Sequence, residues 1–585
     1  MIASPNRSDE GPCESVNGYC FYTTGVGGAC AAYGFEPPAG YWCHSSPPRG
    51  AEYTVAFPSG LRPGAAAFDG RRWASWRPNE TLVSAFRQGH WFTYTWLVDA
   101  YDAAARTLNW TRGGFQGGEG VPASAGGAEE WFVENVLDEL DSPNEYYYDV
   151  AARRLFYFHN GTGAPPAELA FEAVGALEQL ITIAGEDGGA DGGVDGGAER
   201  GAARDIALRG LVFSGASATQ LAPHGLPSDG GGDWALARRA AVHFLGNVSR
   251  ATVERCLFSR VDGNALMVSG RARGIEIVEN EFHLVGESAI VQWGRTRDFE
   301  DDGGAAPPRN LPAGVGPDAR GGDHPVGTRV IANFVHEIGH NQKQVSCYFQ
   351  AQSERTTLSR NLCFNGPRAG FNVNDGMAGG NLLERNLIFN MVRETADHGA
   401  FNSWDRQPFF VADPTGPSGA GTFTPADNEI TRNFWINDYN PQEATDNDDG
   451  SCYYHTHHNY FPLSANGLKS DFGGHDNRHH DNVYYVSTSC VGVCAQKPGH
   501  IDAFYNNTCL INSAGPEYAS FSPGIGGDAW PEMHDNRVYT LDGNASESGG
   551  SLASWQAQGV DVGTTIAGMP PDDAIIAMGR AVLQM

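Results

Sequence analysis

Side chains that can exchange protons are concentrated in one part of this sequence, between residues 372 and 480. They form four short clusters, which are Asn372–Gly376, Glu394–Arg406, Asp446–Gly450 and Lys469–His480. Each cluster contains at least one carboxyl group. Two carboxyls can act as an acid and a base when their surroundings push their pKa values apart. The residue types therefore predict acid–base chemistry, provided that the fold brings the clusters together.

A repeated phrase runs through the same region and predicts how the clusters are positioned. Each copy begins with Asn, or a stand-in for it, followed by mostly apolar residues. The anchors are Arg255, Asn280, Asn333, Asn361, Asn386, Asn433, Asn459, Asn482 and Asn507. The steps from each anchor to the next are 25, 53, 28, 25, 47, 26, 23 and 25, and the two long steps equal one period plus an insertion. A repeat of this length indicates a solenoid, in which each unit buries its apolar face against its neighbours.

Each repeat unit is expected to consist of short strands. Its apolar runs are rich in Val, Ile, Phe and Leu and are interrupted by Gly, Asn and Asp, which is typical of strands and turns. One period suits three strands and three turns, with Asn side chains hydrogen-bonding along the stack. A leucine-rich repeat would need an LxxLxL spacing that the sequence lacks. We therefore predict an all-β chain built on a right-handed parallel β-helix solenoid of about ten coils.

The spacing of the carboxyls from the anchors suggests that they lie on one face. Asp375 follows Asn361 at an offset of 14, and Asp448 and Asp449 follow Asn433 at offsets of 15 and 16. Strands stacked about 4.8 Å apart would hold carboxyls near the roughly 5 Å separation of retaining glycosidases, or, two coils apart, near the inverting range of about 6.5–9.5 Å. Our predicted pair of acid and nucleophile or base is Asp405 and Asp449. The competing candidates are Asp375, Asp397 and Asp448.

Other polar residues of the clusters are assigned supporting or alternative roles. Lys469 and His475 are candidate bases for a different reaction, the removal of the C5 proton of a uronate. His398 is a candidate for orienting groups or relaying protons, and Trp404 or Tyr453 would raise a neighbouring carboxyl's pKa by desolvation. The side chains predicted to hold a sugar are Asn402, Trp404, Arg406 and Gln407. Any single Asp before Gly is more often a turn residue, so the prediction depends on several lying together.

Metal binding is a weaker interpretation of the same residues. Asp446–Gly450 allows a Ca²⁺ site, but an EF-hand loop would need Glu where this chain has His457. The three residues His455, His457 and His458 suggest a transition metal only weakly, because a further ligand is unassigned. The sequence therefore predicts no required cofactor, with Ca²⁺ as an optional one.

Composition limits the classes of partner. The chain has 585 residues, 41% of them hydrophobic, and a formal charge of −30. This acidity disfavours nucleic acid and anionic membranes, and no apolar run reaches the length of about 20 residues that crosses a membrane. We expect a monomer whose partner is a polysaccharide. Seven N-x-S/T sequons, at Asn6, Asn79, Asn109, Asn160, Asn247, Asn506 and Asn544, favour a secreted glycoprotein, although no signal peptide is visible at the start.

The cysteines also favour an extracellular protein. The N-terminal set of Cys13, Cys20, Cys30 and Cys43 is predicted to form two disulfides. Cys490 and Cys494 are spaced to close a small loop. Three further cysteines at apolar ladder positions are predicted to be buried thiols, namely Cys256, Cys363 and Cys509.

The chain divides into four expected segments. Residues 1–50 form a Cys-rich segment, 51–180 a β-rich lobe, 181–545 the β-helix and 546–585 a tail whose helix would cap the open end. Residues 185–201 are almost entirely Gly, Asp, Ala and Glu and are predicted to be a disordered loop interrupting the first coil. In the lobe, Trp131–Asn135 is predicted to be a short helix, followed by a turn and an aromatic hairpin ending at Phe158.

Three passages resemble a known family. Residues 134–158 are similar to the phrase ENxxExLDxPGEWYxDxxxxxLYY of secreted β-helix glycoside hydrolases of the family 141 type, with Asn144 in place of Gly and Tyr146 in place of Trp. Ile206–Phe213 resembles that family's NIxIxGLTF phrase, and Leu552–Gln556 resembles the start of its closing phrase. The resemblance implies a pectin-lyase-like β-helix that hydrolyses a polysaccharide, either a neutral one or one that bears fucose or xylose.

Two alternatives to hydrolysis stay open from the sequence. A polysaccharide lyase or C5-epimerase would use Lys469 or His475 as its base, with Arg406 or Arg478 neutralising the uronate carboxyl. The acidic composition disfavours such a substrate. A non-catalytic glycan-binding protein would keep the coil without a working acid pair.

Overall fold

The structure is a computed structural model, which describes the greater part of the chain. The described residues are 14–16, 19–21, 76–86, 93–102, 107–113, 131–185, 201–222, 236–294, 324–374, 379–404, 411–412, 421–422, 426–437, 442–448, 451–471, 474–494, 501–521 and 530–585. The N-terminal cysteines Cys13, Cys30 and Cys43, the side chain of Cys20 and residues 186–200 of the predicted loop lie outside this set.

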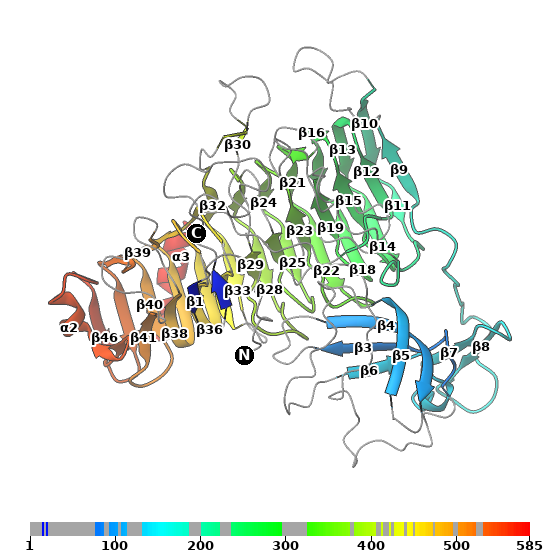
Figure 1. Ribbon diagram of the computed structural model, residues 1–585, viewed down its shortest axis with the longest axis horizontal. Helices are drawn as coiled ribbons and strands as arrows, with labels where there is room; N and C mark the ends of the chain where they lie inside the picture. Colours follow the sequence, from blue (N-terminus) through cyan, green and yellow to red (C-terminus); the bar gives the residue numbers. More distant parts are fainter. Residues whose placement is uncertain are drawn as a thin grey trace.

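Two large parallel sheets dominate the molecule, which confirms the prediction of an all-β chain (Figure 1). Their strands stack in register from the N-terminal side, shown in green, to the C-terminal side, shown in orange. The first sheet has 13 strands. They are β10 Ala203–Arg209, β13 Val248–Glu254, β16 Ala272–Arg273, β17 Glu276–Val278, β20 Pro325–Val326, β21 Arg329–Ile331, β24 Thr357–Ser359, β27 Leu382–Glu384, β32 Asn428–Thr431, β35 Tyr454–His457, β37 Arg478–His480, β39 Ala503–Tyr505 and β42 Glu532–His534.

The second sheet has 23 strands arranged as two ladders, joined through β36 Tyr460–Ser470 and β38 Val483–Val493, which pair in both. One ladder contains β11 Val212–Phe213, β14 Leu257–Val261, β18 Glu281–Val285, β22 Phe334–Ile338, β25 Leu362–Phe364, β28 Leu387–Phe389, β33 Phe434–Ile436, β40 Thr508–Ile511, β43 Arg537–Thr540 and β46 Thr565–Gly568. The other contains β9 Ile181–Ala184, β12 Val242–Leu245, β15 Leu266–Ser269, β19 Ile290–Trp293, β23 Tyr348–Ala351, β26 Phe371–Asn374, β29 Phe401–Trp404, β34 Glu443–Asn447, β41 Glu517–Phe521, β44 Ser546–Glu547 and β45 Gly550–Ser551. We call the strands between one anchor asparagine and the next a rung.

The anchor asparagines form a continuous buried ladder between the two sheets. From Asn280 to Asn507, each side-chain amide donates to the side-chain oxygen of the next anchor at 3.0–3.1 Å. The residue before each of these anchors has a positive φ, as at Glu279 (55°) and Asp481 (53°), so the chain bends sharply there. The amide is suited to this position because it both donates and accepts.

The first anchor lies one residue later than predicted. Arg255 has a φ of 50°, which is the conformation of the residue before an anchor, and the backbone nitrogen of Cys256 donates to Asn280 Oδ1 at 2.9 Å. Cys256 therefore occupies the asparagine position of its rung. A thiol at this point cannot donate and accept as an amide does, which is why the ladder of amide-to-amide bonds starts one rung later.

The disulfides differ from the sequence-based pairing. Cys347 bonds Cys363, and Cys490 bonds Cys509 rather than Cys494. The predictions of buried thiols at Cys363 and Cys509 were therefore wrong, whereas Cys256 is a buried thiol. The paired cysteines are 16 and 19 residues apart, and each disulfide joins two neighbouring rungs inside the core. Burial alone gives no sign of which cysteines pair.

The N-terminal lobe is a four-stranded antiparallel sheet followed by a hairpin. Its strands are β3 Leu82–Phe86, β4 Thr93–Asp102, β5 Thr107–Gly113 and β6 Trp131–Glu134, and the hairpin pairs β7 Tyr146–Asp149 with β8 Arg154–Tyr157. The helix predicted at residues 131–135 is instead β6, and a single 3₁₀ turn follows at Leu137–Glu139. Two further two-stranded sheets pair β1 Glu14–Val16 with β2 Tyr19–Phe21 and β30 Val411–Ala412 with β31 Gly421–Thr422.

The residues that carry the family resemblance hold turns of this lobe. The Asn135 amide donates to Glu80 O and Tyr148 O at 3.0 and 3.1 Å, and its oxygen accepts from Tyr148 N at 2.8 Å. Glu145 accepts from the backbone nitrogens of Asp141 and Ser142 at 2.9 and 2.8 Å. Their role here is structural, because each satisfies backbone groups that a turn leaves without partners.

The C-terminal helix does not lie where the sequence suggested. The helix α3 Asp572–Leu583 packs through Ile575 against Val483 and Leu510, on the outer side of β38 and β40. Gly579 allows this approach, because a Cβ there would meet the Tyr460 ring at 2.5 Å. The short helix α2 Leu552–Gln556 instead lies beside β44 and β45. The short helix α2 therefore lies at the end of the stack, and the longer helix α3 packs on one side of it.

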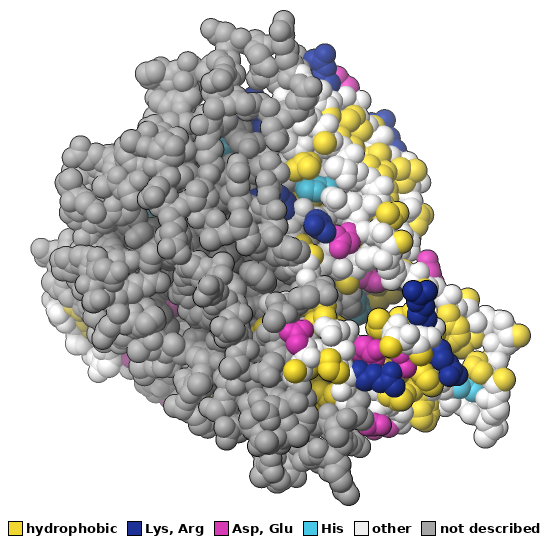
Figure 2. All heavy atoms as spheres, turned by 45° about the vertical axis from the view of Figure 1, so that its right-hand side comes forward, with side chains coloured by type: hydrophobic (Ala, Val, Ile, Leu, Met, Phe, Trp, Pro, Cys, Tyr) yellow, Lys and Arg dark blue, Asp and Glu magenta, His cyan; other side chains and the backbone are white. Residues whose placement is uncertain are grey.

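Surface chemistry on the described part of the molecule is mixed. On the face shown in Figure 2, hydrophobic side chains are interspersed with single charged ones, and Lys or Arg lie beside Asp or Glu in the lobe. The described part of that face carries no continuous basic patch. Within the described ranges, no helix is long and apolar enough to span a bilayer.

Candidate functional site

One register position of neighbouring rungs carries polar side chains. Backbone pairing aligns Asn372 of β26, Asn402 of β29, Asp446 of β34 and Lys469 of β36. The preceding position of each strand includes residues such as Phe401 and Leu468, which belong to the hydrophobic core. Because side chains alternate along a strand, the four polar residues point away from that core, yet all of them are largely buried.

Lys469 gathers four carboxyl groups around its ammonium. Its Nζ lies 3.2 Å from Asp397 Oδ1 and Asp446 Oδ1, and 3.4 Å from Asp448 Oδ1 and Asp471 Oδ2. These five residues are called the Lys469 cluster below. The side chain of Asp397 is 35% exposed and that of Asp448 20%, whereas Asp446 is fully buried. Four acids facing one cation cannot all ionise without strong repulsion.

Asp446 is held from several sides. Its Oδ2 accepts from Asn402 Nδ2 at 2.7 Å and lies 3.3 Å from His398 Nδ1. Burial raises the pKa of Asp446 to about 7, with a contribution from Asp448, while Lys469 and Asn402 oppose the shift. Near neutral pH this carboxyl is therefore divided between its protonated and ionised forms.

The other acids of the region are shifted in the same direction. Burial raises the pKa of Asp471 to about 6 and also raises that of Asp397, in each case against the field of Lys469. Burial raises the pKa of Glu443, which lies on β34, well above its usual range. Burial would lower the pKa of Lys469, but the surrounding carboxylates hold it well above its usual range. The site combines a permanent cation with carboxyls whose pKa values are raised towards neutral pH.

A cavity of about 520 Å³ opens beside the cluster. Glu443 and Lys469 form part of its wall, and hydroxyl side chains of the following rungs, among them Ser487, Ser489 and Ser513, form another part. The cavity lies within the lower half of the range, roughly 300–1,000 Å³, that small-molecule sites occupy. Its lining combines hydroxyl side chains with apolar residues such as Val491 and Pro516, which suits a sugar, a ligand with hydroxyl groups and apolar C–H faces.

The structure brings together five of the predicted site residues. Asp397, Asp448 and Lys469 belong to the cluster, and His398 and Asn402 contact it through Asp446. The predicted residues that lie outside the described set are Asp375, Asp405, Arg406, Gln407 and Asp449. Trp404 is described through its backbone, which pairs with Asn374 at the end of β29.

Tyr453 and His475 lie at a turn beyond β34. Their rings meet edge to face with centroids 5.4 Å apart, and His475 Nδ1 is 2.7 Å from Asp476 Oδ2. Residue 475 pairs with Cys452 in an isolated bridge at this turn. The described contacts of these two residues therefore place them with each other and with Asp476.

Sequence reasoning missed Glu443 and Asp471 and considered Asp446 only as a calcium ligand. The aligned residues Asn372, Asn402, Asp446 and Lys469 follow their anchors at offsets of 11, 16, 13 and 10, because the turns differ in length. Counting from the anchors therefore could not align them. The usable signal was local: in each strand the polar residue directly follows an inward-facing one, as Asn402 follows Phe401 and Lys469 follows Leu468.

No family model and no curated protein matches the sequence. Three solved structures resemble the chain. One described as a glycoside hydrolase is 15% identical, covers 69% of this chain and 68% of its own, and has a TM-score of 0.49. A complex of XylC with xylose is 10% identical, with 63% and 53% covered and a TM-score of 0.32. The catalytic domain of a GH87 α-1,3-glucanase in complex with tetrasaccharides is 11% identical, with 84% and 89% covered and a TM-score of 0.26. Similarities this remote decide nothing about activity, so the function is argued from the site itself.

The carboxyls of the cluster do not fit a metal site. Lys469 already supplies the positive charge that Asp397, Asp446, Asp448 and Asp471 face. Among the described residues, no group of three or more His, Cys, Asp or Glu side chains has an arrangement that could hold a metal ion. We therefore derive no step that uses Ca²⁺.

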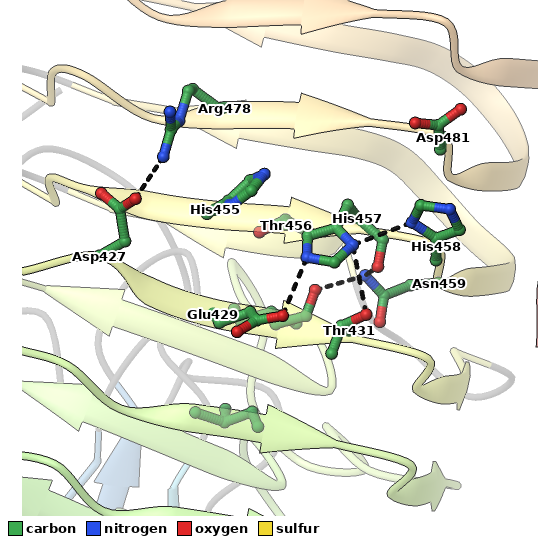
Figure 3. A network of polar contacts seen from close by, with 12 residues as sticks. Asp427, Glu429, Thr431, His455, Thr456, His457, His458, Asn459, Arg478 and Asp481 are labelled. Carbon is green, nitrogen blue, oxygen red and sulfur yellow. Dashed lines mark hydrogen bonds and ion pairs between the residues drawn. The ribbon is translucent and has the colours of Figure 1, made fainter.

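Histidines on β35, directly after it and on β37 form a separate cluster on the 13-stranded sheet, and Figure 3 shows three of them, His455, His457 and His458. His457 stacks on His480 with ring centroids 5.2 Å apart, and His455 Nε2 lies 2.6 Å from His480 Nε2. His457 also contacts His458 and Glu429, at 2.9 and 3.2 Å. These bonds use the ring nitrogens for one another and for a carboxylate. His455, His457, His458 and His480 are called the histidine cluster below.

Proposed function

We propose that the protein is a glycoside hydrolase that cleaves a polysaccharide with carboxyl groups at the Lys469 cluster. The observation that carries the proposal is the gathering of four carboxyls around one fixed ammonium, at the edge of a cavity that is partly lined by hydroxyl groups. Glycosidic hydrolysis needs one protonated and one ionised carboxyl. Burial raises the pKa of Asp446 to about 7 and that of Asp471 only to about 6, so a protonated and an ionised carboxyl can coexist near neutral pH.

The geometry of the cluster is compatible with this chemistry. Two carboxylate oxygens that each lie within 3.4 Å of the same nitrogen are separated by at most twice that distance. This limit includes the roughly 5–5.5 Å separation of retaining enzymes and reaches only the lower end of the inverting range. Asp397, Asp448 and Asp471 are 35%, 20% and 19% exposed, whereas Asp446 is buried, so these three are the acids that a substrate could reach.

The predicted pair Asp405 and Asp449 stays part of the proposal. The described pairings of β26, β29 and β34 end at Asn374 with Trp404 and at Ser403 with Asn447. In the sequence, Asp375, Asp405 and Asp449 come directly after these described stretches. We therefore keep Asp405 and Asp449 as the proposed acid and nucleophile or base, with Arg406, Gln407 and Trp404 as the residues proposed to hold the sugar.

The finer architecture and setting are also proposed. The two sheets support a right-handed parallel β-helix of about ten coils over residues 181–545, preceded by the lobe at 51–180 and followed by the tail at 546–585. The disulfides of the interior support an oxidising, extracellular location, as expected for a secreted glycoprotein acting as a monomer. The resemblance to the family 141 type supports a neutral substrate.

The state of Lys469 weighs against the lyase or epimerase alternative. A base must be deprotonated, whereas the carboxylates around Lys469 hold its pKa well above the usual range. His475 is engaged by Asp476 at the neighbouring turn. A glycan-binding protein without turnover remains the outcome that a negative activity test would indicate.

The test is to incubate the protein with neutral and uronic polysaccharides, measuring new reducing ends and the absorbance of unsaturated uronates together. Hydrolysis predicts reducing ends without absorbance. Asp405→Asn and Asp449→Asn should each lower the rate by about 10²–10⁴-fold if the residue acts as acid, base or nucleophile. Rising absorbance would replace the proposal by a lyase, and glycan retention without either signal would replace it by a binding protein.

A further inference from the structure

Glu443 adjoins the Lys469 cluster and also lines the cavity beside Lys469. Among the described residues, it is the one carboxyl that does both. It lies on β34, on the same strand as Asp446, and its backbone pairs with Asn466 of β36. The residue is 2% exposed, and it forms the cavity wall together with Lys469. A buried acid at a cavity edge is costly unless it serves a partner or a ligand.

The polar atoms of Glu443 are incompletely used. Among the described residues, its Oε2 has no hydrogen-bond partner. A second buried glutamate of the same fold provides a contrast: Glu287, also 2% exposed, accepts from Thr219 N and Thr219 Oγ1 at 3.0 and 2.7 Å. A structural role explains why Glu287 is buried, because its carboxylate accepts hydrogen bonds that the turn needs. A structural role does not explain Glu443, whose Oε2 is left without a partner at the edge of a cavity.

The surroundings favour the protonated form of Glu443. Burial is the largest cause that raises its pKa, and the nearby acids Asp446 and Asp397 add to it, while Lys469 and a side-chain hydrogen bond with Asn466 oppose the rise. Such a group can donate a hydrogen bond, and then a proton, to an oxygen atom placed in the cavity. Another part of the wall offers the hydroxyls of Ser487, Ser489 and Ser513, which are suited to sugar hydroxyls.

We infer that Glu443 is the proton donor of the hydrolytic reaction and that the cavity beside it receives the sugar whose bond is cleaved. This inference rests on the proposed function. Glu443 gives its proton to the glycosidic oxygen as the C–O bond breaks, so the departing part leaves as a neutral alcohol. Water supplies the hydroxyl of the new sugar end, and its remaining proton returns, directly or through a second carboxylate and solvent, to Glu443.

The experiment compares Glu443→Gln with the parent protein on two kinds of substrate. On the polysaccharide identified by the panel, the variant should lose about 10²–10⁴-fold in rate, because the leaving oxygen is no longer protonated. On a glycosyl fluoride or a dinitrophenyl glycoside of the same sugar, whose leaving groups need no proton, it should keep most of its rate. The fall in rate at high pH should also disappear from its pH profile.

Two control variants keep the test decisive. Glu287→Gln makes the same substitution at an equally buried glutamate away from the cavity and should leave both rates unchanged. Glu443→Asp keeps a carboxyl and should retain part of the polysaccharide rate, so it remains informative if Glu443→Gln folds poorly. Thermal unfolding of each variant separates folding from catalysis.

The outcomes separate this inference from the proposed function. If the parent protein hydrolyses a polysaccharide and Glu443→Gln does so equally well, Glu443 is not the donor, although hydrolysis stands. Equal losses on natural and activated substrates would also overturn the assignment, because they would indicate a role other than protonation. If the parent protein cleaves nothing in the panel, the proposed function itself fails.

Discussion

The Lys469 cluster and the histidine cluster are built in the same way but carry opposite electrostatics. In each, successive rungs place titratable side chains at matching positions, as Asp446 pairs with Lys469 and His457 pairs with His480. The first mixes four acids with one cation, whereas in the second the imidazoles of His457 and His480 stack on each other. The comparison shows that a repeated register concentrates charge, and that the residue types then decide which protonation state the fold favours.

The two clusters should therefore respond to pH in opposite directions. Burial raises the pKa of Asp446 to about 7, so the folded state holds a proton that the unfolded chain releases, and stability is lost as pH rises towards 7. Burial and neighbouring histidines lower the pKa of His457 to about 4, so the unfolded chain binds its proton first. Stability from this residue is lost as pH falls from about 6.5 to about 4.

The largest effect is expected from removing the shared cation. Lys469→Met should cost about 3–5 kcal/mol of unfolding free energy near neutral pH, because Asp446 and its neighbours are left buried without a counter-charge. The loss should be smaller near pH 5, where Asp446 and Asp471 can be protonated. Denaturant unfolding at the two pH values measures it. An equal loss at both would mean that the carboxyls are not what Lys469 stabilises.

An intermediate effect of opposite sign is expected from the histidine cluster. His457→Gln removes an imidazole that the folded state keeps neutral, so the variant should lose less stability than the parent protein on acidification. The difference between them should reach about 1–2 kcal/mol near pH 4.5. Thermal unfolding across the pH range checks this, with His159→Gln in the lobe as the control. A parallel pH dependence of parent and variant would contradict the assigned electrostatics.

The sequence was sufficient to predict positions at which only one residue type meets the structural need. It was insufficient at positions where several residue types can do so. The asparagine ladder could be predicted because each bend needs a side chain that donates and accepts at once. Among the predicted anchors only Arg255 was misplaced, because Cys256 occupies the asparagine position of that rung. The alignment of Asn372, Asn402, Asp446 and Lys469 could not be predicted, because turn lengths vary between rungs. Cys363 and Cys509 occupy core positions at which a free thiol and a disulfide-bonded cysteine give the same sequence pattern. Their disulfides therefore could not be predicted from the sequence.

The smallest effect on stability is expected at an exposed ion pair beside the histidines. Arg478 contacts Asp427, and their side chains are 44% and 46% exposed (Figure 3). Arg478→Ala should therefore cost less than about 1 kcal/mol, and less still in high salt, in contrast to the removal of Lys469.

The same variant should act on a neighbouring pKa. Burial is the main cause that lowers the pKa of His455 to about 4, and the charges of His457 and Arg478 contribute. Removing Arg478 should move the pKa of His455 upwards, towards the usual value, which NMR titration of the imidazole can measure. A large loss of stability with an unchanged pKa would show that Arg478 is a packing residue. The pKa shifts in the histidine cluster would then be due to burial and not to the charges of neighbouring residues.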